Sequence, residues 1–253
     1  MQTKIIDLPA RIVKRIFERG PTDAVRWLWE HFAWRIRERR LGIETETWIE
    51  ADELGLPEGG HCYEPITYAA FDSIIEHLDI HPDRDVFLDY GCGKGRAVVL
   101  AALQPFKRVI GVEYSKDLCD IANKNLAIVG SKVRAGSVEI VQCDAAEYEL
   151  PAEVTNIYLW NSFNGRVMDR VHENIRKSLE TSPRRMVIFS GVPEQEEDML
   201  ARLPWLPEPF RLPSKYFTGV HVVVYEIPEP NAETAIGPPS STVVQAESSP
   251  NVG

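Results

Sequence analysis

The chain of 253 residues contains few cysteines and no long hydrophobic run. Its cysteines lie 24 to 30 residues apart and form no C-x-x-C pair, which excludes the spacing of common zinc sites and of a disulfide framework. The longest apolar run, Ala97 to Leu103, is far shorter than the roughly 20 residues that a membrane-spanning helix needs. Residues 1–10 lack the apolar core of a signal peptide. We therefore expect a cytoplasmic protein without a metal site. The cysteines are Cys62, Cys92, Cys119 and Cys143.

Charge is distributed unevenly along the chain. Residues 1–40 contain ten basic and five acidic residues, a net charge of +5, and because the whole chain carries −10, residues 41–253 carry −15. An acidic body repels phosphates and argues against a nucleic-acid-binding face there. The apolar share of 44% allows one full-sized core. We expect an N-terminal helical extension over 1–62, a globular domain over 63–228, and a disordered tail over 229–253, which is rich in Pro, Ser, Ala, Glu and Gly.

The most informative segment is Val86–Arg96, where an apolar strand leads through three alternating glycines into a helix. Gly91, Gly93 and Gly95 can adopt backbone angles that are closed to other residues, and they let the main chain approach a ligand closely. Asp89 adds a carboxylate at the carboxyl end of the strand, where open α/β sheets bind ligands. The segment predicts a site for a nucleoside-type ligand. A tight turn without a ligand is the alternative for the glycines taken alone.

Two later strands also lead to an acidic residue. Glu113 ends the apolar segment 108–113, and its two oxygens can accept hydrogen bonds from both hydroxyls of a ribose. Asp144 closes the segment 138–144 and is placed to meet an adenine amino group. Asp144 and Glu147 also match a capping box for a following helix, and this role does not exclude the first. Three successive strands that close on carboxylates strengthen the prediction of a nucleoside site.

Apolar periodicity predicts alternating helices and strands from residue 63 onward. Expected helices cover Pro65–Ile80 and Arg96–Leu103, with one that Ser115 caps and one that carries Val167, Val171, Ile175 and Leu179. Expected strands cover 86–90, 108–113, 138–144, 156–160, 185–190, 210–217 and 220–227. Strands that alternate with helices predict an α/β fold with a doubly wound, mostly parallel, seven-stranded sheet, and the last two runs predict a C-terminal antiparallel hairpin.

The basic N-terminal region predicts an amphipathic helix over residues 21–40. We favour a helix that packs on the globular domain and leaves a basic face in solvent. A contact with a membrane surface or a protein partner through residues 21–40 stays open, because Trp27 and Trp34 flank the apolar stripe. The stripe consists of Val25, Leu28, Trp29, Phe32 and Ile36.

The motif Asp89-Tyr-Gly-Cys-Gly-Lys-Gly95 resembles the first motif of the class I S-adenosylmethionine-dependent methyltransferases. The resemblance covers about residues 63–228 and implies S-adenosylmethionine as the cofactor. It implies that the glycine turn accommodates the methionine part, Glu113 holds the ribose and Asp144 holds the adenine. The substrate is not specified by it. The matching positions are Asp89, Gly91, Gly93, Gly95, Glu113 and Asp144.

Two other functions stay open at this point. An NAD(P)-dependent oxidoreductase fits less well, because its fingerprint spaces the glycines G-x-G-x-x-G, whereas this chain has Arg96 at the sixth place. A non-catalytic module that binds S-adenosylmethionine for a partner is the third function.

The same resemblance places the chemistry after the fourth strand, in Asn161-Ser-Phe163. In family members that methylate nitrogen, an Asn (or Asp)-Pro-Pro-aromatic tetrad occupies this place, and Asn161 and Phe163 match its ends. We expect a small-molecule or protein acceptor, with nitrogen favoured, although Asn161 could equally turn or cap the chain. Tyr63 and Tyr68 precede the first strand and are expected to fold over the cofactor, with core packing as the alternative. The segments Tyr63–Tyr68 and Phe87–Gly91 resemble bacterial methyltransferases with a basic N-terminal extension. Gly111-Val-Glu113 and the aromatic lead-in resemble, more faintly, the non-SET histone-lysine methyltransferases.

Overall fold

The computed structural model describes residues 13, 16–17, 20–46, 63, 65–160, 165–193, 203–212 and 220–229. The tail that was predicted to be disordered lies, from residue 230 onward, outside the described residues. The helices are α2 (Pro21–Leu41), α3 (Tyr68–His77), α4 (Arg96–Ala102), α5 (Lys116–Val129), the 3-10 turn η1 (Gly130–Lys132) and α6 (Gly165–Thr181). The strands are β1 (Val86–Tyr90), β2 (Arg108–Glu113), β3 (Val138–Gln142), β4 (Asn156–Trp160), β5 (Met186–Pro193), β6 (Phe210–Arg211) and β7 (Val220–Ile227).

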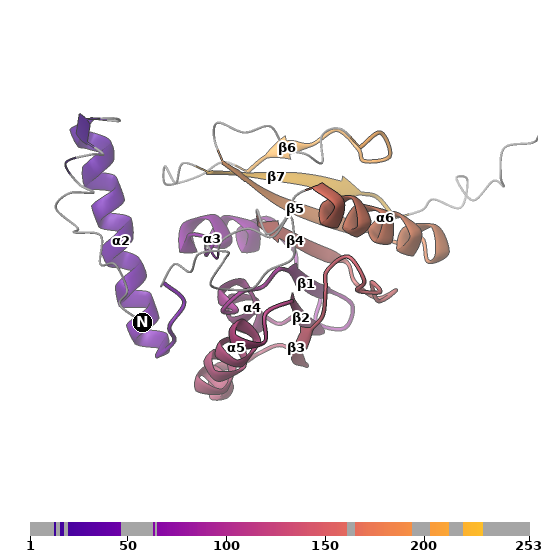
Figure 1. Ribbon diagram of the computed structural model, residues 1–253, viewed down its shortest axis with the longest axis horizontal. Coiled ribbons are helices and arrows are strands. Elements are labelled where there is room, and N and C mark those ends of the chain that lie inside the picture. The colour runs from indigo at the N-terminus through magenta and orange to yellow at the C-terminus, as the bar shows by residue number, and fades with distance from the viewer. Residues whose placement is uncertain are drawn as a thin grey trace, which may run out of the picture.

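The seven strands form one sheet in the order β3-β2-β1-β4-β5-β7-β6 (Figure 1). The first five strands in chain order run parallel, whereas β7 is antiparallel to both β5 and β6. This arrangement confirms the predicted doubly wound sheet with an antiparallel C-terminal pair. The strand order reverses between β1 and β4, and the carboxyl ends at such a reversal are where open α/β sheets bind ligands.

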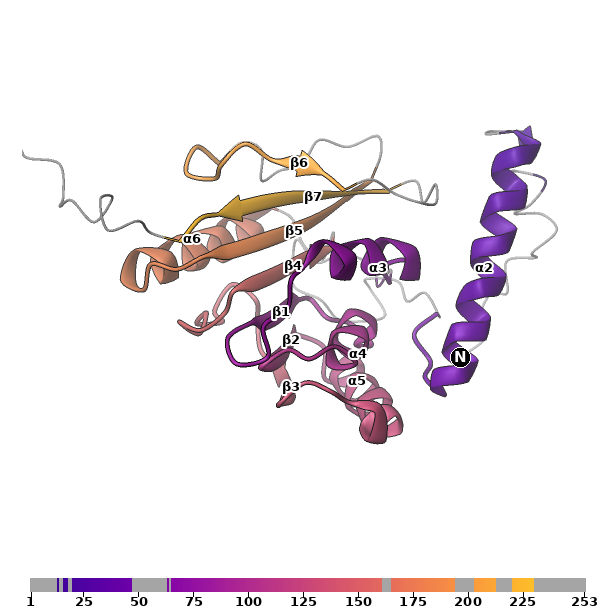
Figure 2. The ribbon, with the colours of Figure 1, turned by 180° about the vertical axis from the view of Figure 1, so that it is seen from behind.

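Alternate side chains of the central strands point to opposite faces of the sheet and build two hydrophobic cores. On one face, Phe87 of β1 packs with Phe71 of α3 and Val98 of α4. On the other face, Leu88 packs with Val171 of α6. Figures 1 and 2 show α3, α4 and α5 on one side of the sheet and α6 on the other. Burial of both faces explains why β1 is apolar at nearly every position.

The predicted N-terminal helix is confirmed as α2, which is the outermost helix on the α3–α5 side in both views (Figures 1 and 2). The face that packs on the domain differs from the prediction. Trp34 packs against the core cluster of α3 and α4, and the Arg37 guanidinium lies 2.6 Å from the Asp72 carboxylate of α3. The expectation that the apolar stripe packs on the domain is wrong, because polar contacts hold the helix and the stripe is exposed. Its exposed members are Val25, Trp29, Phe32 and Ile36.

Some elements have other bounds than predicted. Helix α3 begins only at Tyr68, because the Thr67 hydroxyl accepts a hydrogen bond from the Ala70 N–H and so caps the first turn. It ends at His77, where Leu78 adopts an extended conformation. Ser115 occupies the N-cap of α5 as predicted, but its side chain makes no capping hydrogen bond. None of the described helices is long and apolar enough to cross a membrane.

Candidate functional site

The turn after β1 depends on three glycines in a left-handed conformation. Gly91, Gly93 and Gly95 have φ values of 75°, 55° and 79°, which confirms the predicted need for glycine. The N–H groups of Gly91 and Cys92 both donate to the Val112 carbonyl of β2, at 2.8 and 2.9 Å. The turn is thus fixed to the neighbouring strand, and Gly95 forms the N-cap of α4.

Glu113, the last residue of β2, lies against this turn. One carboxylate oxygen accepts a hydrogen bond from the Gly93 N–H at 2.9 Å, and the other accepts one from the Ser115 N–H at 2.8 Å. Burial raises the pKa of the Glu113 carboxyl, although these N–H groups favour its charged form. The structure thus places the second-strand acid directly against the glycine turn, and its predicted role in holding a ribose stays a prediction.

Asp89 is a second buried carboxylate at the same edge. Asp89 belongs to β1 and is only 3% exposed. Burial raises the pKa of the Asp89 carboxyl well above its ordinary value, and the nearby Glu113 carboxylate raises it further. Two carboxylates that share a buried site make that site favourable for a cation.

We expect Asp89→Asn to stabilise the free protein at neutral and alkaline pH. When the pKa of a carboxyl is higher in the folded state than in the unfolded state (about 3.9), its contribution to stability is fully present below about pH 3.9. This contribution is lost as the pH rises through the folded-state pKa. Asn does not ionise, so the variant does not lose this stability. The free energy of unfolding of the variant should therefore exceed that of the parent by an amount that grows from pH 5 to pH 8 and reaches at least about 1 kcal/mol, roughly the equivalent of one pKa unit.

Urea unfolding across this pH range measures the gain. Asp117→Asn is the matched control, because Asp117 lies in the exposed first turn of α5, and we expect it to change stability by less than about 0.5 kcal/mol. A pH-independent difference between the parent and Asp89→Asn would contradict the assignment of a raised pKa.

Asp144 lies two residues beyond β3 and is half-buried. The predicted helix after it is absent: residues 145–147 form a turn, in which the Asp144 carboxylate accepts a hydrogen bond from the Ala146 N–H at 2.8 Å. The capping-box prediction is therefore wrong: no helix directly follows Asp144, because its carboxylate bonds to the N–H two residues on and so stabilises a local turn. One carboxylate oxygen thus fixes the turn.

Tyr63 covers the middle of the glycine turn. A Cβ added at Gly93 would overlap the Tyr63 ring, so the ring lies directly on the backbone there. The Tyr63 hydroxyl donates to the Thr45 carbonyl at 2.9 Å, and the Lys94 ammonium lies 5.5 Å from the ring centroid. Burial raises the pKa of the phenol, so Tyr63 is a neutral hydrogen-bond donor at physiological pH.

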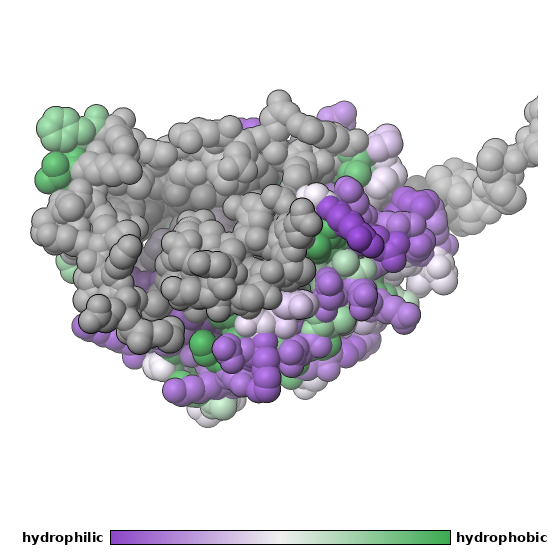
Figure 3. All heavy atoms as spheres, viewed as in Figure 1, coloured by the Kyte–Doolittle hydropathy of each residue, from purple (hydrophilic) through white to green (hydrophobic). Residues whose placement is uncertain are grey.

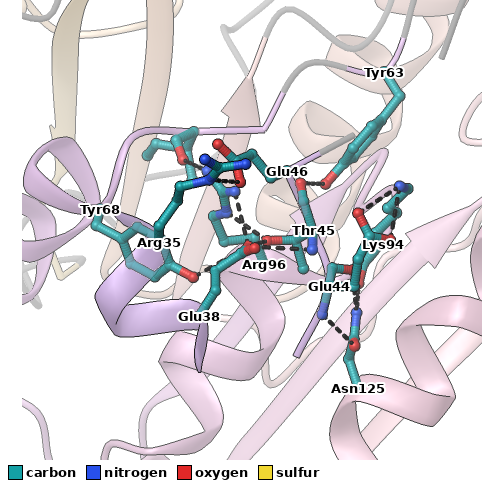
Figure 4. A network of polar contacts seen from close by, with 11 residues as sticks. Arg35, Glu38, Glu44, Thr45, Glu46, Tyr63, Tyr68, Lys94, Arg96 and Asn125 are labelled. Carbon is teal, nitrogen blue, oxygen red and sulfur yellow. Dashed lines mark hydrogen bonds and ion pairs between the residues drawn. The ribbon is translucent and has the colours of Figure 1, made fainter. Parts of the chain in front are cut away.

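Arg96, at the start of α4, joins the glycine turn to the N-terminal region (Figure 4). It is 2% exposed, and its guanidinium donates to the Thr45 hydroxyl at 2.7 Å, the Ile66 carbonyl at 2.8 Å and the Glu38 carboxylate of α2 at 3.1 Å. The Glu38 carboxylate also accepts hydrogen bonds from the Thr45 N–H and hydroxyl. The buried charge is thereby paired and hydrogen-bonded.

Residues 43–46, which we call the strap, are held on the turn by two further contacts (Figure 4). The Asn125 side chain of α5 accepts from the Glu44 N–H at 3.1 Å and donates to the Glu44 and Lys94 carbonyls, both at 3.0 Å. The buried Lys94 ammonium lies 3.0 Å from the Glu44 carboxylate. The strap, and through it Tyr63, is thus positioned by side chains from α4, α5 and the turn.

Tyr68, the other predicted cofactor tyrosine, lies in the Arg96 network. Its hydroxyl donates to the Glu38 carboxylate at 3.4 Å, and its ring contacts the Arg37 and Arg96 guanidinium groups, which lie 4.8 and 4.7 Å from the centroid. Burial raises the pKa of its hydroxyl to about 12. Of the two tyrosines, Tyr63 is the one whose ring touches the glycine turn.

The predicted catalytic residues Asn161 and Phe163 lie outside the described residues. The strand that precedes them, β4, pairs with β1 so that Leu159 lies opposite Tyr90, and it ends at Trp160. The carboxyl end of β4 is therefore beside the glycine turn. Among the described residues, no cluster of three or more His, Cys, Asp or Glu side chains could hold a metal ion.

Sequence reasoning missed the Arg96 network. Arg96 was noted for its sixth place in the glycine motif and as the start of a helix, and Glu38 was counted only as one of the acidic residues of 1–40. The available signal was a charged residue that opens an otherwise apolar helix, Arg96–Ala102, all of whose residues are buried. Such a side chain needs an acidic partner, which the sequence does not identify.

Comparison with known proteins identifies the domain. Residues 87–182 match a family described as "Methyltransferase domain". The histone-lysine N-methyltransferase specific for H3 lysine-79 from Dictyostelium discoideum is 39% identical over 75 residues, which are 27% of this chain and 4% of that protein. The ribosomal protein L11 methyltransferase of Sorangium cellulosum is 28% identical over 169 residues, which are 63% of this chain and 49% of that protein. The chain thus spans less than half the length of either relative.

Among solved structures, an RNA methyltransferase from Salinibacter ruber in complex with S-adenosyl-L-homocysteine superposes with a TM-score of 0.49. It is 26% identical and covers 67% of this chain and 97% of its own. The family match covers β1 through α6, which includes the glycine turn, Glu113 and Asp144. The seven-stranded, mostly parallel sheet with antiparallel C-terminal strands agrees with the fold that the sequence resemblance implied. The chain therefore contains a class I, S-adenosylmethionine-dependent methyltransferase domain.

Proposed function

We propose that this protein transfers the methyl group of S-adenosylmethionine to a nitrogen acceptor beside Asn161. The observation that carries the proposal is the glycine turn with the Glu113 carboxylate hydrogen-bonded to the Gly93 N–H, at the point where the strand order reverses. S-adenosylmethionine supplies an already activated methyl group on its sulfonium, so the protein has mainly to bind and align.

The described side chains fit a cationic nucleoside. The three glycines of the turn have left-handed backbone angles, which let the main chain lie close to a bound molecule. The Glu113 carboxylate accepts hydrogen bonds from the Gly93 and Ser115 N–H groups, and because a carboxylate has about four acceptor positions it can also receive ribose hydroxyls. A cation bound beside Asp89 and Glu113 would favour the charged form of both carboxyls, whose pKa values burial raises in the free protein. The second oxygen of Asp144 stays available for the adenine amino group.

Tyr63 is the described residue best placed to cover the cofactor and exclude water, because its ring lies on the glycine turn. Tyr68 remains a proposed cofactor residue, and its contacts with Glu38 and Arg96 indicate that it acts by holding the strap and the start of α3 in place.

Two arguments favour a protein nitrogen over RNA as the acceptor. Two relatives are named for methylation of proteins, histone H3 and ribosomal protein L11, although both matches cover only part of those proteins. Residues 41–253 carry a net charge of −15, which opposes the approach of a polyphosphate chain. A small-molecule amine is compatible with the same site.

Transfer of a labelled methyl group tests this proposal. The parent protein, S-adenosylmethionine labelled in its methyl group and a lysate fractionated into protein, RNA and small molecules should give label mainly in the protein or small-molecule fraction. Label in RNA alone would overturn the nitrogen-on-protein assignment, and no label in any fraction would favour a non-catalytic binding module.

We expect Asn161→Ala to lower turnover by roughly a hundredfold through lost alignment of the acceptor, with nearly unchanged affinity for S-adenosylmethionine. Asn123→Ala on α5 is the control, because that amide donates to the Cys119 carbonyl of its own helix and bonds to no other described element. Equal losses of affinity and turnover in Asn161→Ala would show that the residue only shapes the fold.

A further inference from the structure

Exposed apolar side chains are concentrated on the N-terminal helix. Of the ten large apolar residues that are exposed in the described part of the chain, seven lie between residues 13 and 36. Four of them form one stripe on α2, which we call the outer stripe, and Trp29 is the most exposed of these at 74%. The outer stripe consists of Val25, Trp29, Phe32 and Ile36. Figure 3 shows apolar residues at the upper left, where one end of α2 lies in Figure 1.

The charges around the outer stripe have one sign. At 100° per residue, Arg39 falls beside Phe32 and Arg40 falls beside Trp29, so that arginines border the stripe on both sides. Both arginines are exposed, and neither forms an ion pair with another described residue. The acidic residues of the helix fall on the opposite half of its circumference; they are Asp23, Glu30 and Glu38.

We propose that the outer stripe docks the protein on a membrane surface that contains anionic phospholipid. A helix with an aromatic and aliphatic stripe between arginines lies in the plane of the interface, with the apolar side chains at the boundary of headgroups and acyl chains. Arg39 and Arg40 reach the phosphates while their aliphatic stems stay on the apolar surface. Trp29 suits the interface because its ring is apolar and its N–H is polar.

The opposite face of α2 packs on the domain, whereas the outer stripe is exposed. The Arg37–Asp72 ion pair and the Glu38–Arg96 hydrogen bond fix that inner face to the domain. Docking through the stripe therefore requires no opening of the fold, and it is independent of the function proposed for the glycine turn.

Charge complementarity favours a lipid surface over two other occupants. A symmetric contact with a second copy would place Arg39 and Arg40 against the same face of the partner, which offers them no carboxylate. RNA would attract the arginines but would not bury aliphatic side chains such as Val25 and Ile36. An anionic bilayer surface satisfies both the apolar and the basic residues.

Vesicle co-sedimentation of the full chain tests the proposal. We expect the parent to sediment with vesicles of mixed phosphatidylcholine and phosphatidylglycerol, more weakly in high salt, and to stay in solution with phosphatidylcholine alone. The pairs Trp29→Ser with Phe32→Ser and Arg39→Gln with Arg40→Gln should each weaken binding at least about tenfold. The control pair Arg170→Gln with Arg176→Gln removes two exposed arginines from α6 and should leave binding unchanged.

Other outcomes overturn the proposal. The proposal is wrong if the parent does not bind the anionic vesicles or binds the neutral ones equally well. It is also wrong if the Trp29→Ser, Phe32→Ser variant and the Arg39→Gln, Arg40→Gln variant both bind like the parent. Light scattering that shows a dimer of the parent and a monomer of the Trp29→Ser, Phe32→Ser variant would assign the stripe to a second copy. Binding of RNA that the arginine pair abolishes, without vesicle binding, would assign it to nucleic acid. Unfolding midpoints of the variants equal to that of the parent exclude a loss of fold as the cause.

Discussion

Gly93→Val should lower the affinity for S-adenosylmethionine at least about a thousandfold, or about 4 kcal/mol. Residue 93 has a φ of 55°, which a β-branched side chain rarely adopts, and its Cβ would overlap the Tyr63 ring. The turn, or the ring, has to move from the position that the Glu113 carboxylate and the Thr45 carbonyl define. Isothermal titration calorimetry measures the loss.

Gly130→Val is the matched control for this prediction. Gly130 has a φ of −42° and no atom within 4 Å of a Cβ built there, so the same substitution should change affinity little. Gly93→Val combined with Tyr63→Ala separates a steric effect from a loss of fold, because the double variant should recover unfolding stability relative to Gly93→Val. Parent-like affinity in a folded Gly93→Val protein would refute the placement of the cofactor on this turn.

Arg96→Met should destabilise the fold by about 3–5 kcal/mol, because it leaves the Glu38 carboxylate buried without its cation. It also removes donors from Thr45 and Ile66, so the strap and Tyr63 lose their anchor. We expect weaker binding of S-adenosylmethionine as a consequence. Urea unfolding measures the first effect and calorimetry the second.

Arg108→Met provides the comparison at the surface. Arg108 forms ion pairs with Glu139 and Glu153, but its side chain is 30% exposed, and we expect a loss of about 1 kcal/mol or less. The double variant Arg96→Met with Glu38→Leu should be more stable than Arg96→Met, because it removes the unpaired charge. If Arg96→Met cost no more than Arg108→Met, the buried network would have no special role in holding the strap.

Most of the fold was predictable because local patterns coincide with the packing. The buried strands read as continuous apolar runs, and β1, β2 and β4 have the predicted bounds. The glycine turn was predictable from positions where only glycine tolerates the backbone angle, and Glu113 was predictable because it ends a neighbouring parallel strand. The structure brings these groups together as expected.

Features that depend on distant residues were not predictable. Thr45 and Glu38 reach Arg96 across more than fifty positions, and nothing in the local sequence identifies them as its partners. The periodicity of residues 21–40 identified an apolar stripe on α2 but did not show whether the stripe faces the domain or solvent. Ion pairs of Arg37 and Glu38 on the other side of the helix determine how it packs. Asp144 does not cap a helix, because its carboxylate accepts from the Ala146 N–H and stabilises a turn instead.

Calorimetric titration of the parent with S-adenosylmethionine and, separately, with NAD tests the central claim most directly. The glycine turn with Glu113, Asp89 and Asp144 predicts saturable binding of S-adenosylmethionine at one site, competition by S-adenosylhomocysteine, and no heat with NAD. Binding of NAD without binding of S-adenosylmethionine would contradict the assignment of this site.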